Sequence, residues 1–163
     1  MVTVPTWTYQ GQLITNIDDM PEGSYGFIYK VIHKPSGKKY IGKKVLYFER
    51  NKRLGKRALE ALREERAKKG IKGRVPLKQK VIKESDWKDY HGSNEQVKQL
   101  RESGKLFKRR ILHLCRTKGE CSYYEAKLQF ENDVLLRDDY YNEFIGCKIH
   151  SKFIKDMKNE YNN

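Results

Sequence analysis

Two tyrosines in the first quarter of the chain have the residue type and spacing of a pair that could act together. Tyr29 and Tyr40 are 11 positions apart, in runs 26–33 and 38–47 that are rich in β-branched and aromatic residues, as strands are. The loop 34–37 contains Pro and Gly and predicts a hairpin. With an even number of loop residues, positions an odd distance apart share a face. The spacing therefore predicts both phenols on one face of a sheet; the alternative is two residues that serve only packing.

Two roles are open to Glu125, a helix cap and a metal ligand, and the residues around it favour the cap. The four histidines and three cysteines have no metal-ligand spacing, so a metal would depend on one carboxylate with substrate and water oxygens, which suits Mg²⁺ or Mn²⁺. Glu125 also forms the pattern Ser122-x-x-Glu125, which predicts a capping box in which it bonds the Ser122 backbone amide. That box would open a helix to about residue 136, with these residues on one face: Tyr123, Ala126, Phe130 and Val134.

The charge of the chain is strongly positive and unevenly distributed. The 163 residues carry a formal net charge of +14. Residues 34–83 hold 19 Lys and Arg against four Glu, whereas residues 1–25 hold three acids and no base. Such a density of cations is typical of a protein that binds a polyanion, with an affinity that depends on salt. The alternative for a charge run is a well-solvated surface.

Length and composition exclude several classes of protein. The chain is short enough for one domain, has no run of about 18 apolar residues that could span a membrane, and shows no signal peptide after Met1. Three cysteines form no disulfide framework, which favours a reducing compartment. We expect a basic, soluble, intracellular domain without a membrane partner.

The order of the predicted elements indicates an α+β fold. A small antiparallel sheet of three strands, 26–33, 38–47 and 106–115, is expected to be flanked by helices. Residues 51–85 form a basic insertion, with a helix at 53–69 that ends at Gly70 and a mobile loop at 70–85. A capping box of Ser93 and Gln96 opens a further helix that ends at Gly104. The remaining predictions are short strands at 7–16 within an N-terminal extension 1–25, a main domain 26–147, and a C-terminal tail 148–163.

Two short motifs resemble those of a known family. Phe27-Ile28-Tyr29 and Tyr40-Ile41-Gly42 resemble the paired motifs of the GIY-YIG nucleases, with the first glycine, Gly26, displaced by one position. The resemblance extends to about Asn142. The run Tyr90-His91-Gly92-Ser93 resembles a segment of the phage-type homing-endonuclease branch.

The resemblance implies an endonuclease that hydrolyses phosphodiester bonds of double-stranded DNA with one Mg²⁺ or Mn²⁺ ion. It implies that Glu125 holds the metal and that Tyr29, or Tyr40 through it, takes a proton from water. This role requires a pKa below the usual value near 10, which the lysines around Tyr40 would favour. Arg50 would stabilise the transition state, with Arg53 and Arg57 as alternatives in the alignment.

The same resemblance places Asn142 after the last core helix, where it would orient the glutamate or tie the chain ends together; otherwise it is an ordinary turn residue. We expect DNA contacts from Lys43, Lys44, Arg53, Arg57, Lys68, Lys69, Lys72 and Arg74. Two other functions stay open. One is a non-catalytic nucleic-acid binder on the same scaffold, and the other is a basic RNA-binding domain, although no aromatic RNA-recognition strand is present. A phage-encoded enzyme would act in the cytoplasm of its bacterial host.

Overall fold

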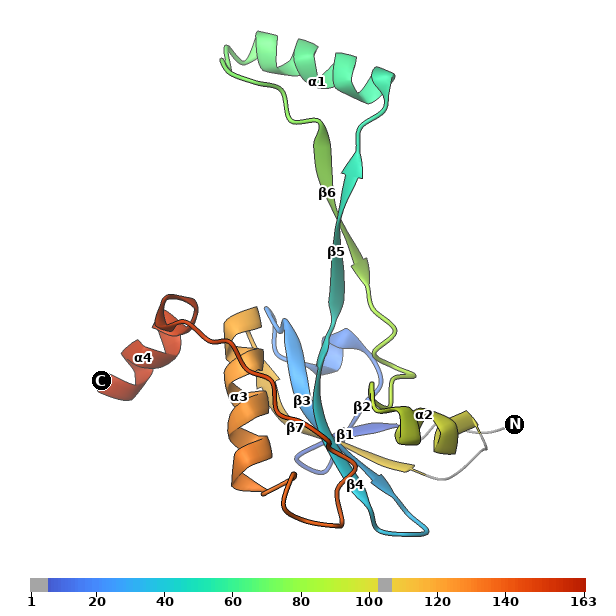
Figure 1. Ribbon diagram of the computed structural model, residues 1–163. Helices are drawn as coiled ribbons and strands as arrows, with labels where there is room; N and C mark the ends of the chain where they lie inside the picture. Colours follow the sequence, from blue (N-terminus) through green and yellow to red (C-terminus); the bar gives the residue numbers. More distant parts are fainter. Residues whose placement is uncertain (1–5, 103–106) are drawn as a thin grey trace. The chain divides into compact units, whose positions relative to one another are not determined.

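The computed structural model describes residues 6–102 and 107–163 and divides them into two compact units. The first unit contains residues up to Leu46 and from Ser85 onward, and the second is Tyr47–Glu84. Figure 1 shows the elements of both units.

The first unit is built on a five-stranded mixed sheet. Its strand order is β2-β1-β7-β3-β4, and β1 runs parallel to β7 while the other neighbours are antiparallel. The prediction of a three-stranded antiparallel sheet was therefore wrong in strand number and in direction, because the hairpin at residues 7–14 pairs with β7 and enlarges the sheet. The strands are β1 Trp7–Tyr9, β2 Gln12–Ile14, β3 Gly26–His33, β4 Lys39–Val45 and β7 Phe107–Cys115.

The central hairpin has the register that its loop length predicts. Tyr29 pairs with Gly42, and Val31 pairs with Tyr40. Tyr29 and Tyr40 consequently lie on one face of the sheet, one diagonal apart, because residues two apart on a strand point the same way. The loop between them closes with Gly37, at φ +71°, donating its amide to the His33 carbonyl at 2.7 Å.

The two faces of this sheet carry different cores. The face that holds Tyr29 packs aromatic side chains edge to face, Trp7 against Phe27 at 5.0 Å and Phe27 against Trp87 at 6.3 Å between ring centroids. The other face buries Ile28 and neighbouring apolar residues under helix α3, Lys118–Glu131. Fully burying a ring of this size contributes about 1.5–3 kcal/mol relative to exposure, so the aromatic face contributes to the stability of the first unit.

Helix α3 begins earlier than the sequence predicts. Its N-cap is Thr117, whose Oγ1 accepts a hydrogen bond from the Glu120 amide at 3.1 Å. Ser122 and Glu125 therefore lie inside the helix, and the capping box predicted for them is wrong. The predicted apolar face was wrong at Tyr123 and Phe130, which are 37% and 61% exposed, whereas Ala126 and Val134 are buried as predicted. The helix ends at Glu131 rather than near residue 136.

The other elements of the first unit are short. Helix α2, Glu95–Glu102, is capped by Asn94, whose Oδ1 accepts from the amides of Gln96 and Val97. Asn94 thus replaces Ser93 as the cap, because its side chain reaches both free amides. The predicted end at Gly104 lies outside the described residues. Three helical segments remain: η1 Ile17–Asp19, η2 Ser151–Ile154 and α4 Lys155–Asn162.

The second unit is a two-stranded ribbon with a helix at its end (Figure 1). Strand β5, Tyr47–Arg53, pairs antiparallel with β6, Lys78–Glu84, and helix α1, Lys56–Lys68, lies between them in the chain. The prediction of a mobile loop at 70–85 was wrong from residue 78 onward, because the alternation Lys-Gln-Lys-Val-Ile-Lys pairs with β5. Gly70, at φ +64°, follows the helix as predicted.

No helix in residues 6–102 and 107–163 is long and apolar enough to cross a membrane.

Candidate active site

Three tyrosines form a cluster on the aromatic face of the sheet. The ring of Tyr29 lies 6.2 Å from that of Tyr40 and 5.9 Å from that of Tyr90 between centroids. Tyr29 is 1% exposed, and its hydroxyl is hydrogen-bonded to that of Tyr90. The Tyr40 hydroxyl lies 3.2 Å from the Ser93 Oγ. The cluster therefore joins two strands to the segment that precedes α2.

Two glycines leave the space that the tyrosine rings occupy. A Cβ atom built on Gly42 would lie 2.6 Å from the Tyr29 hydroxyl oxygen and 2.9 Å from the Tyr40 ring. A Cβ on Gly92, which has φ +137°, would lie 3.2 Å from the Tyr40 ring. The glycine of the Tyr40-Ile41-Gly42 motif thus has a steric reason, because any side chain there would separate the two phenols.

Replacing Gly42 by alanine is expected to destabilise the first unit. The added methyl must displace the rings of Tyr29 and Tyr40, at a cost of about 1–3 kcal/mol for overpacking. We expect the free energy of unfolding, measured by urea titration, to fall by about that amount. Gly55→Ala is the control, since a Cβ there meets no atom within 4 Å. Equal stability of the two variants would contradict the steric role of Gly42.

A buried lysine completes the tyrosine face. Lys44 pairs with Phe27 across the hairpin and is 8% exposed. Its Nζ lies 3.9 Å from the centroid of the Tyr90 ring and 2.5 Å from Asp86 Oδ1. The ion pair lowers the pKa of Asp86. This lysine supplies a positive charge beside the phenols and orients Tyr90 through a cation–π contact.

Glu125 lies on α3 and is paired with Lys43 of β4, the edge strand of the sheet. Lys43 Nζ is 3.0 Å from Glu125 Oε2 and donates to the Ser122 Oγ at 3.3 Å. The Glu125 side chain is 17% exposed. Its charge contributes to raising the pKa of both Tyr29 and Tyr40, so the carboxylate is within electrostatic reach of the phenols.

The pKa values of the two phenols differ from expectation. Burial raises the pKa of Tyr29 well above its usual value and raises the pKa of Tyr40 as well. The predicted lowering by neighbouring lysines is not found, because these lysines face other groups. Lys39 pairs with Asp139 at 2.7 Å, Lys43 with Glu125 and Lys44 with Asp86, while Lys38 lies over the Tyr141 ring. Both phenols are neutral hydrogen-bonding groups in the free protein.

Asn142 holds the edge strand at the residue between Tyr40 and Gly42. Its Nδ2 donates to the Ile41 carbonyl at 2.8 Å, and its Oδ1 accepts from the Ile41 amide at 3.1 Å. Gln129 Nε2 donates to the same carbonyl at 3.0 Å. The side-chain amide continues a parallel pairing of residues 139–141 with β4. In this position Asn142 fixes the backbone that carries the motif.

The remaining predicted cations belong to the second unit. Arg50 lies on β5, in the second unit, whereas the tyrosine cluster belongs to the first. The side chains of all the predicted cations in this unit are exposed: Arg50, Arg53, Arg57, Lys68, Lys69, Lys72 and Arg74. Of the predicted site residues, the first unit contains Tyr29, Tyr40, Lys43, Lys44, Glu125 and Asn142.

A buried histidine and arginine support the segment that carries Tyr90. Arg109 is 2% exposed and donates from Nη1 to the carbonyls of Lys88 at 2.7 Å and Tyr90 at 3.0 Å. Its guanidinium lies over the Trp7 ring at 4.5 Å. His91 is also buried, with Nδ1 2.9 Å from the Asp89 carbonyl. The segment 86–93 is therefore positioned from beneath by the sheet.

His91 is expected to make the fold less stable in mild acid. Burial, together with Arg109 and Arg101 and against the Asp89 hydrogen bond, lowers the pKa of His91 to about 4. As pH falls from 7 to 5, the unfolded chain takes up a proton on this residue and the folded chain does not. The free energy of unfolding should fall by about 2 kcal/mol, as measured by urea titration. His91→Asn keeps a donor near the Asp89 carbonyl and should lose most of this difference; an undiminished difference would exclude His91 as its source.

The donor set is compatible with one hard divalent ion. Within the described residues, no group of three or more His, Cys, Asp or Glu side chains could form a metal cage. Glu125 offers one carboxylate near an open edge of the sheet, and Mg²⁺ is commonly held by one or two carboxylates together with phosphate and water oxygens. The residues present therefore fit an ion that is completed by its substrate.

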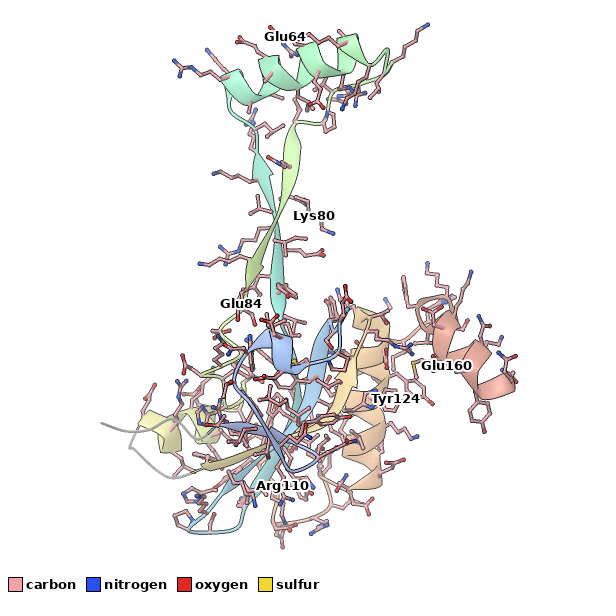
Figure 2. The ribbon with its side chains drawn as sticks, turned by 180° about the vertical axis from the view of Figure 1, so that it is seen from behind. Glu64, Lys80, Glu84, Arg110, Tyr124 and Glu160 are labelled. Carbon is pink, nitrogen blue, oxygen red and sulfur yellow. The ribbon has the colours of Figure 1, made fainter. Side chains whose placement is uncertain are left out.

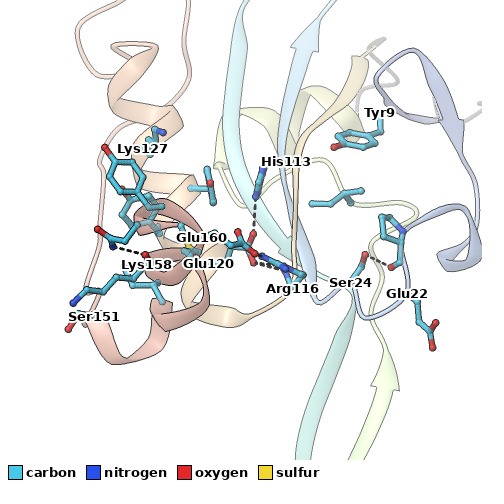
Figure 3. Close-up of a pocket in the computed structure, with 18 residues that line it drawn as sticks. Tyr9, Glu22, Ser24, His113, Arg116, Glu120, Lys127, Ser151, Lys158 and Glu160 are labelled. Carbon is cyan, nitrogen blue, oxygen red and sulfur yellow. Dashed lines mark hydrogen bonds and ion pairs between the residues drawn. The ribbon is translucent and has the colours of Figure 1, made fainter.

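A groove away from the tyrosine cluster lies between β7, α3 and α4 (Figure 3). It has a volume of about 800 Å³. Its polar groups pair with one another, since Glu120 accepts from His113 Nε2 at 3.1 Å and from the Arg116 amide at 3.0 Å. None of the three clustered tyrosines lines it. The geometry that could perform chemistry is the tyrosine cluster.

The sequence predicted no active-site role for Tyr90 or for two residues beside the cluster, Ser93 and Asp86; Ser93 was predicted only as a helix cap. Two of them belong to the run Tyr90-His91-Gly92-Ser93, whose Gly is a signal of unusual backbone geometry. Asp86 carries no comparable signal, because an acid before an aromatic residue is common on any surface.

A family model described as "Putative endonuclease segE, GIY-YIG domain" matches residues 7–145. No curated protein and no solved structure matches the chain. The matched range contains both strand motifs, the metal-ligand candidate in α3 and the asparagine that pairs with Ile41. The chain belongs to the GIY-YIG endonuclease domain family.

Proposed function

We propose that this protein is a divalent-metal-dependent endonuclease that hydrolyses double-stranded DNA at a single-metal site. The observation that supports this most directly is the tyrosine cluster on the GIY-YIG hairpin, with Glu125 within electrostatic reach of both phenols. The net charge of +14 favours a polyanionic substrate.

Water is the attacking group in this proposal. Its oxygen forms a bond to phosphorus while the bond from phosphorus to the 3′ oxygen breaks. The water releases a proton to solvent and the 3′ oxygen takes one from solvent, so the products are a 5′ phosphate and a 3′ hydroxyl. Tyr40 is only half-buried and orients the water with its hydroxyl, supported by Ser93. Tyr29 holds its neighbours in place through the hydrogen bond to Tyr90. Because both pKa values are raised, neither phenol acts as a phenolate in the free protein.

Glu125 is assigned as the protein ligand of the metal. A bound Mg²⁺ or Mn²⁺ would neutralise charge on the phosphate and make its water more acidic. Lys43 holds the glutamate in position by an ion pair at 3.0 Å, which leaves the second carboxylate oxygen for the ion. Lys44 places its positive charge 3.9 Å from the centroid of the Tyr90 ring and Lys43 places its charge beside Glu125, and we assign to these two lysines the stabilisation of the phosphate.

Incubation of supercoiled plasmid with purified protein tests the function. Nicked or linear DNA should accumulate with Mg²⁺ or Mn²⁺ and should not form in EDTA. Tyr40→Phe should lower the rate while retaining the ring that packs on Tyr29. Tyr161→Phe is a control, because Tyr161 is 91% exposed and belongs to the C-terminal helix. Absence of cleavage with either ion would favour the second candidate.

The second candidate is a non-catalytic DNA-binding protein on the same scaffold. It is favoured by the raised pKa values of Tyr29 and Tyr40, which by themselves do not indicate a general base. This candidate predicts duplex binding without cleavage under all metal conditions.

The run Tyr90-His91-Gly92-Ser93 supports placing the proposed nuclease in the phage-type homing-endonuclease branch, and this placement is part of the first proposal.

A further inference from the structure

The ribbon of the second unit has one face with cations and no acid. In the register of β5 and β6, Phe48 pairs with Lys83, Arg50 with Val81, and Lys52 with Gln79. Paired residues of an antiparallel ribbon point to the same side, so these six side chains share one face. We call it the basic face: Phe48, Arg50, Lys52, Gln79, Val81 and Lys83. All six are exposed.

The opposite face mixes both signs of charge. We call it the mixed face: Tyr47, Glu49, Asn51, Arg53, Lys78, Lys80, Ile82 and Glu84. Lys80 pairs with Glu49 at 2.7 Å. Three cations against two acids give a net charge of +1, compared with +3 on the basic face, where three cations meet no acid. Figure 2 labels Lys80 and Glu84 on this ribbon.

Neither face of the ribbon is covered by an element of its own unit. All seven residues of β6 are exposed, and α1 lies across the end of the ribbon (Figures 1 and 2). A two-stranded hairpin alone in water is at most marginally stable, and this one buries little apolar surface. Phe48 is 37% exposed and Val81 40%, between the cations of the basic face. A ligand that covered one face of this ribbon would bury its exposed side chains and stabilise it.

The dimensions of the basic face match duplex DNA. Successive pairs on one face are about 6.8 Å apart, close to two base-pair steps of about 3.4 Å. Each pair on the basic face carries one cation, from Lys83, Arg50 and Lys52 in turn. The major groove of B-form DNA admits a two-stranded ribbon, whereas the A-form major groove is too deep and narrow for side chains to read.

We propose that the basic face binds in the major groove of duplex DNA. Arg50 and Gln79 occupy adjacent pairs and have the hydrogen-bonding ends that recognise guanine and adenine, while Phe48 and Val81 can contact thymine methyl groups. Lys52 and Lys83 contact phosphates. The proposal rests on the proposed function, which makes duplex DNA the substrate. It gives Arg50 a role in recognising bases. The mixed face points away from the base pairs, because its glutamates would meet phosphates.

Two double variants test the choice of face in the Glu125→Gln background, so that cleavage does not disturb binding. Lys52→Gln with Lys83→Gln changes the basic face, and Lys78→Gln with Lys80→Gln changes the mixed face by the same charge. Binding to a fluorescent duplex of mixed sequence is measured over a range of salt concentrations. The basic-face double should lower the slope of log K against log salt by about 1.8, and the mixed-face double by less than one. Circular dichroism checks that both remain folded.

Competition identifies the groove. Methyl green, which occupies the major groove, should displace the protein, whereas netropsin in the minor groove and double-stranded RNA of the same sequence should compete poorly. Equal loss of slope in the two doubles, or displacement by netropsin alone, would overturn the proposal. Plasmid cleavage by the wild type separates the two hypotheses. If the wild type cleaves plasmid but the two double variants lose equal amounts of salt slope, only the proposal about the ribbon face is rejected. If the two doubles differ in slope but the wild type does not cleave plasmid, only the nuclease function is rejected.

Discussion

Replacement of Glu125 by glutamine is expected to abolish cleavage and to leave duplex binding almost unchanged. The change removes the only carboxylate that the proposal gives to the metal but keeps the size of the side chain. Loss of one group that stabilises a transition state commonly costs a hundredfold or more in rate. The affinity for DNA should persist, because the cations of the second unit are untouched. Initial rates of plasmid nicking and fluorescence titration of a duplex measure the two quantities.

Glu131→Gln is the matched control for this experiment. Glu131 lies on the same helix and is also paired with a lysine, Lys127 at 3.8 Å, but it is exposed. Its loss should change the rate less than twofold. Thr117 and not Ser122 caps α3, so replacing Glu125 does not remove a cap from the start of the helix. A rate in Glu125→Gln equal to that of the control would show that Glu125 serves only the ion pair with Lys43.

Neutralising the cations at the far end of α1 is expected to weaken DNA binding and its dependence on salt. Lys68, Lys69, Lys72 and Arg74 are exposed and follow one another at the end of the helix and in the turn. Each phosphate contact contributes about 0.9 to the slope of log K against log salt. Changing all four to glutamine should lower that slope by up to about three or four. Lys69 is paired with Glu65 at 2.5 Å, which reduces its share.

The same quadruple variant should cleave nearly as fast as the wild type at saturating protein, because the tyrosine cluster lies in the other unit. A control with equal loss of charge is available in Lys148, Lys152, Lys155 and Lys158, which are exposed near the C-terminus. That control should retain most of the salt dependence. An unchanged slope with a collapsed maximal rate in the first quadruple would instead place those cations in the chemical step.

Local signals in the sequence were sufficient for the central hairpin. Strand periodicity and an even loop placed Tyr29 and Tyr40 on one face, and the register of β3 and β4 agrees. Strand β7 and the helix before Gly70 were likewise predictable, because β-branched runs and a glycine after a helix act over a few residues. The motif glycine could be recognised from the sequence, although its clash with Tyr29 could not be seen there.

Long-range pairing was decided only by the tertiary structure. Residues 78–84 gave a loop prediction because their partners in β5 lie 25 to 37 residues away in the chain, beyond the window of a periodic pattern. The hairpin at 7–14 joined the main sheet through a parallel pairing with β7 that no local signal encodes. The patterns Thr117-x-x-Glu120 and Ser122-x-x-Glu125 compete within a few residues, and the burial of Cys121 in one cluster with Ile28 and Cys115 of the sheet favours the earlier start of α3.

The chemistry of the site likewise combines features set by the local sequence with features set only by the tertiary structure. The sequence determined which residue types were present, including the two phenols, one carboxylate and many cations. Their ionisation was decided by tertiary structure, since burial raises the pKa of Tyr29 and the nearby lysines pair with acids from distant segments. Tyr90 and Ser93 entered the site because Arg109, buried under the segment, fixes its backbone through two carbonyls. Residue type is local information, whereas burial and pairing arise only when segments far apart in the chain come together.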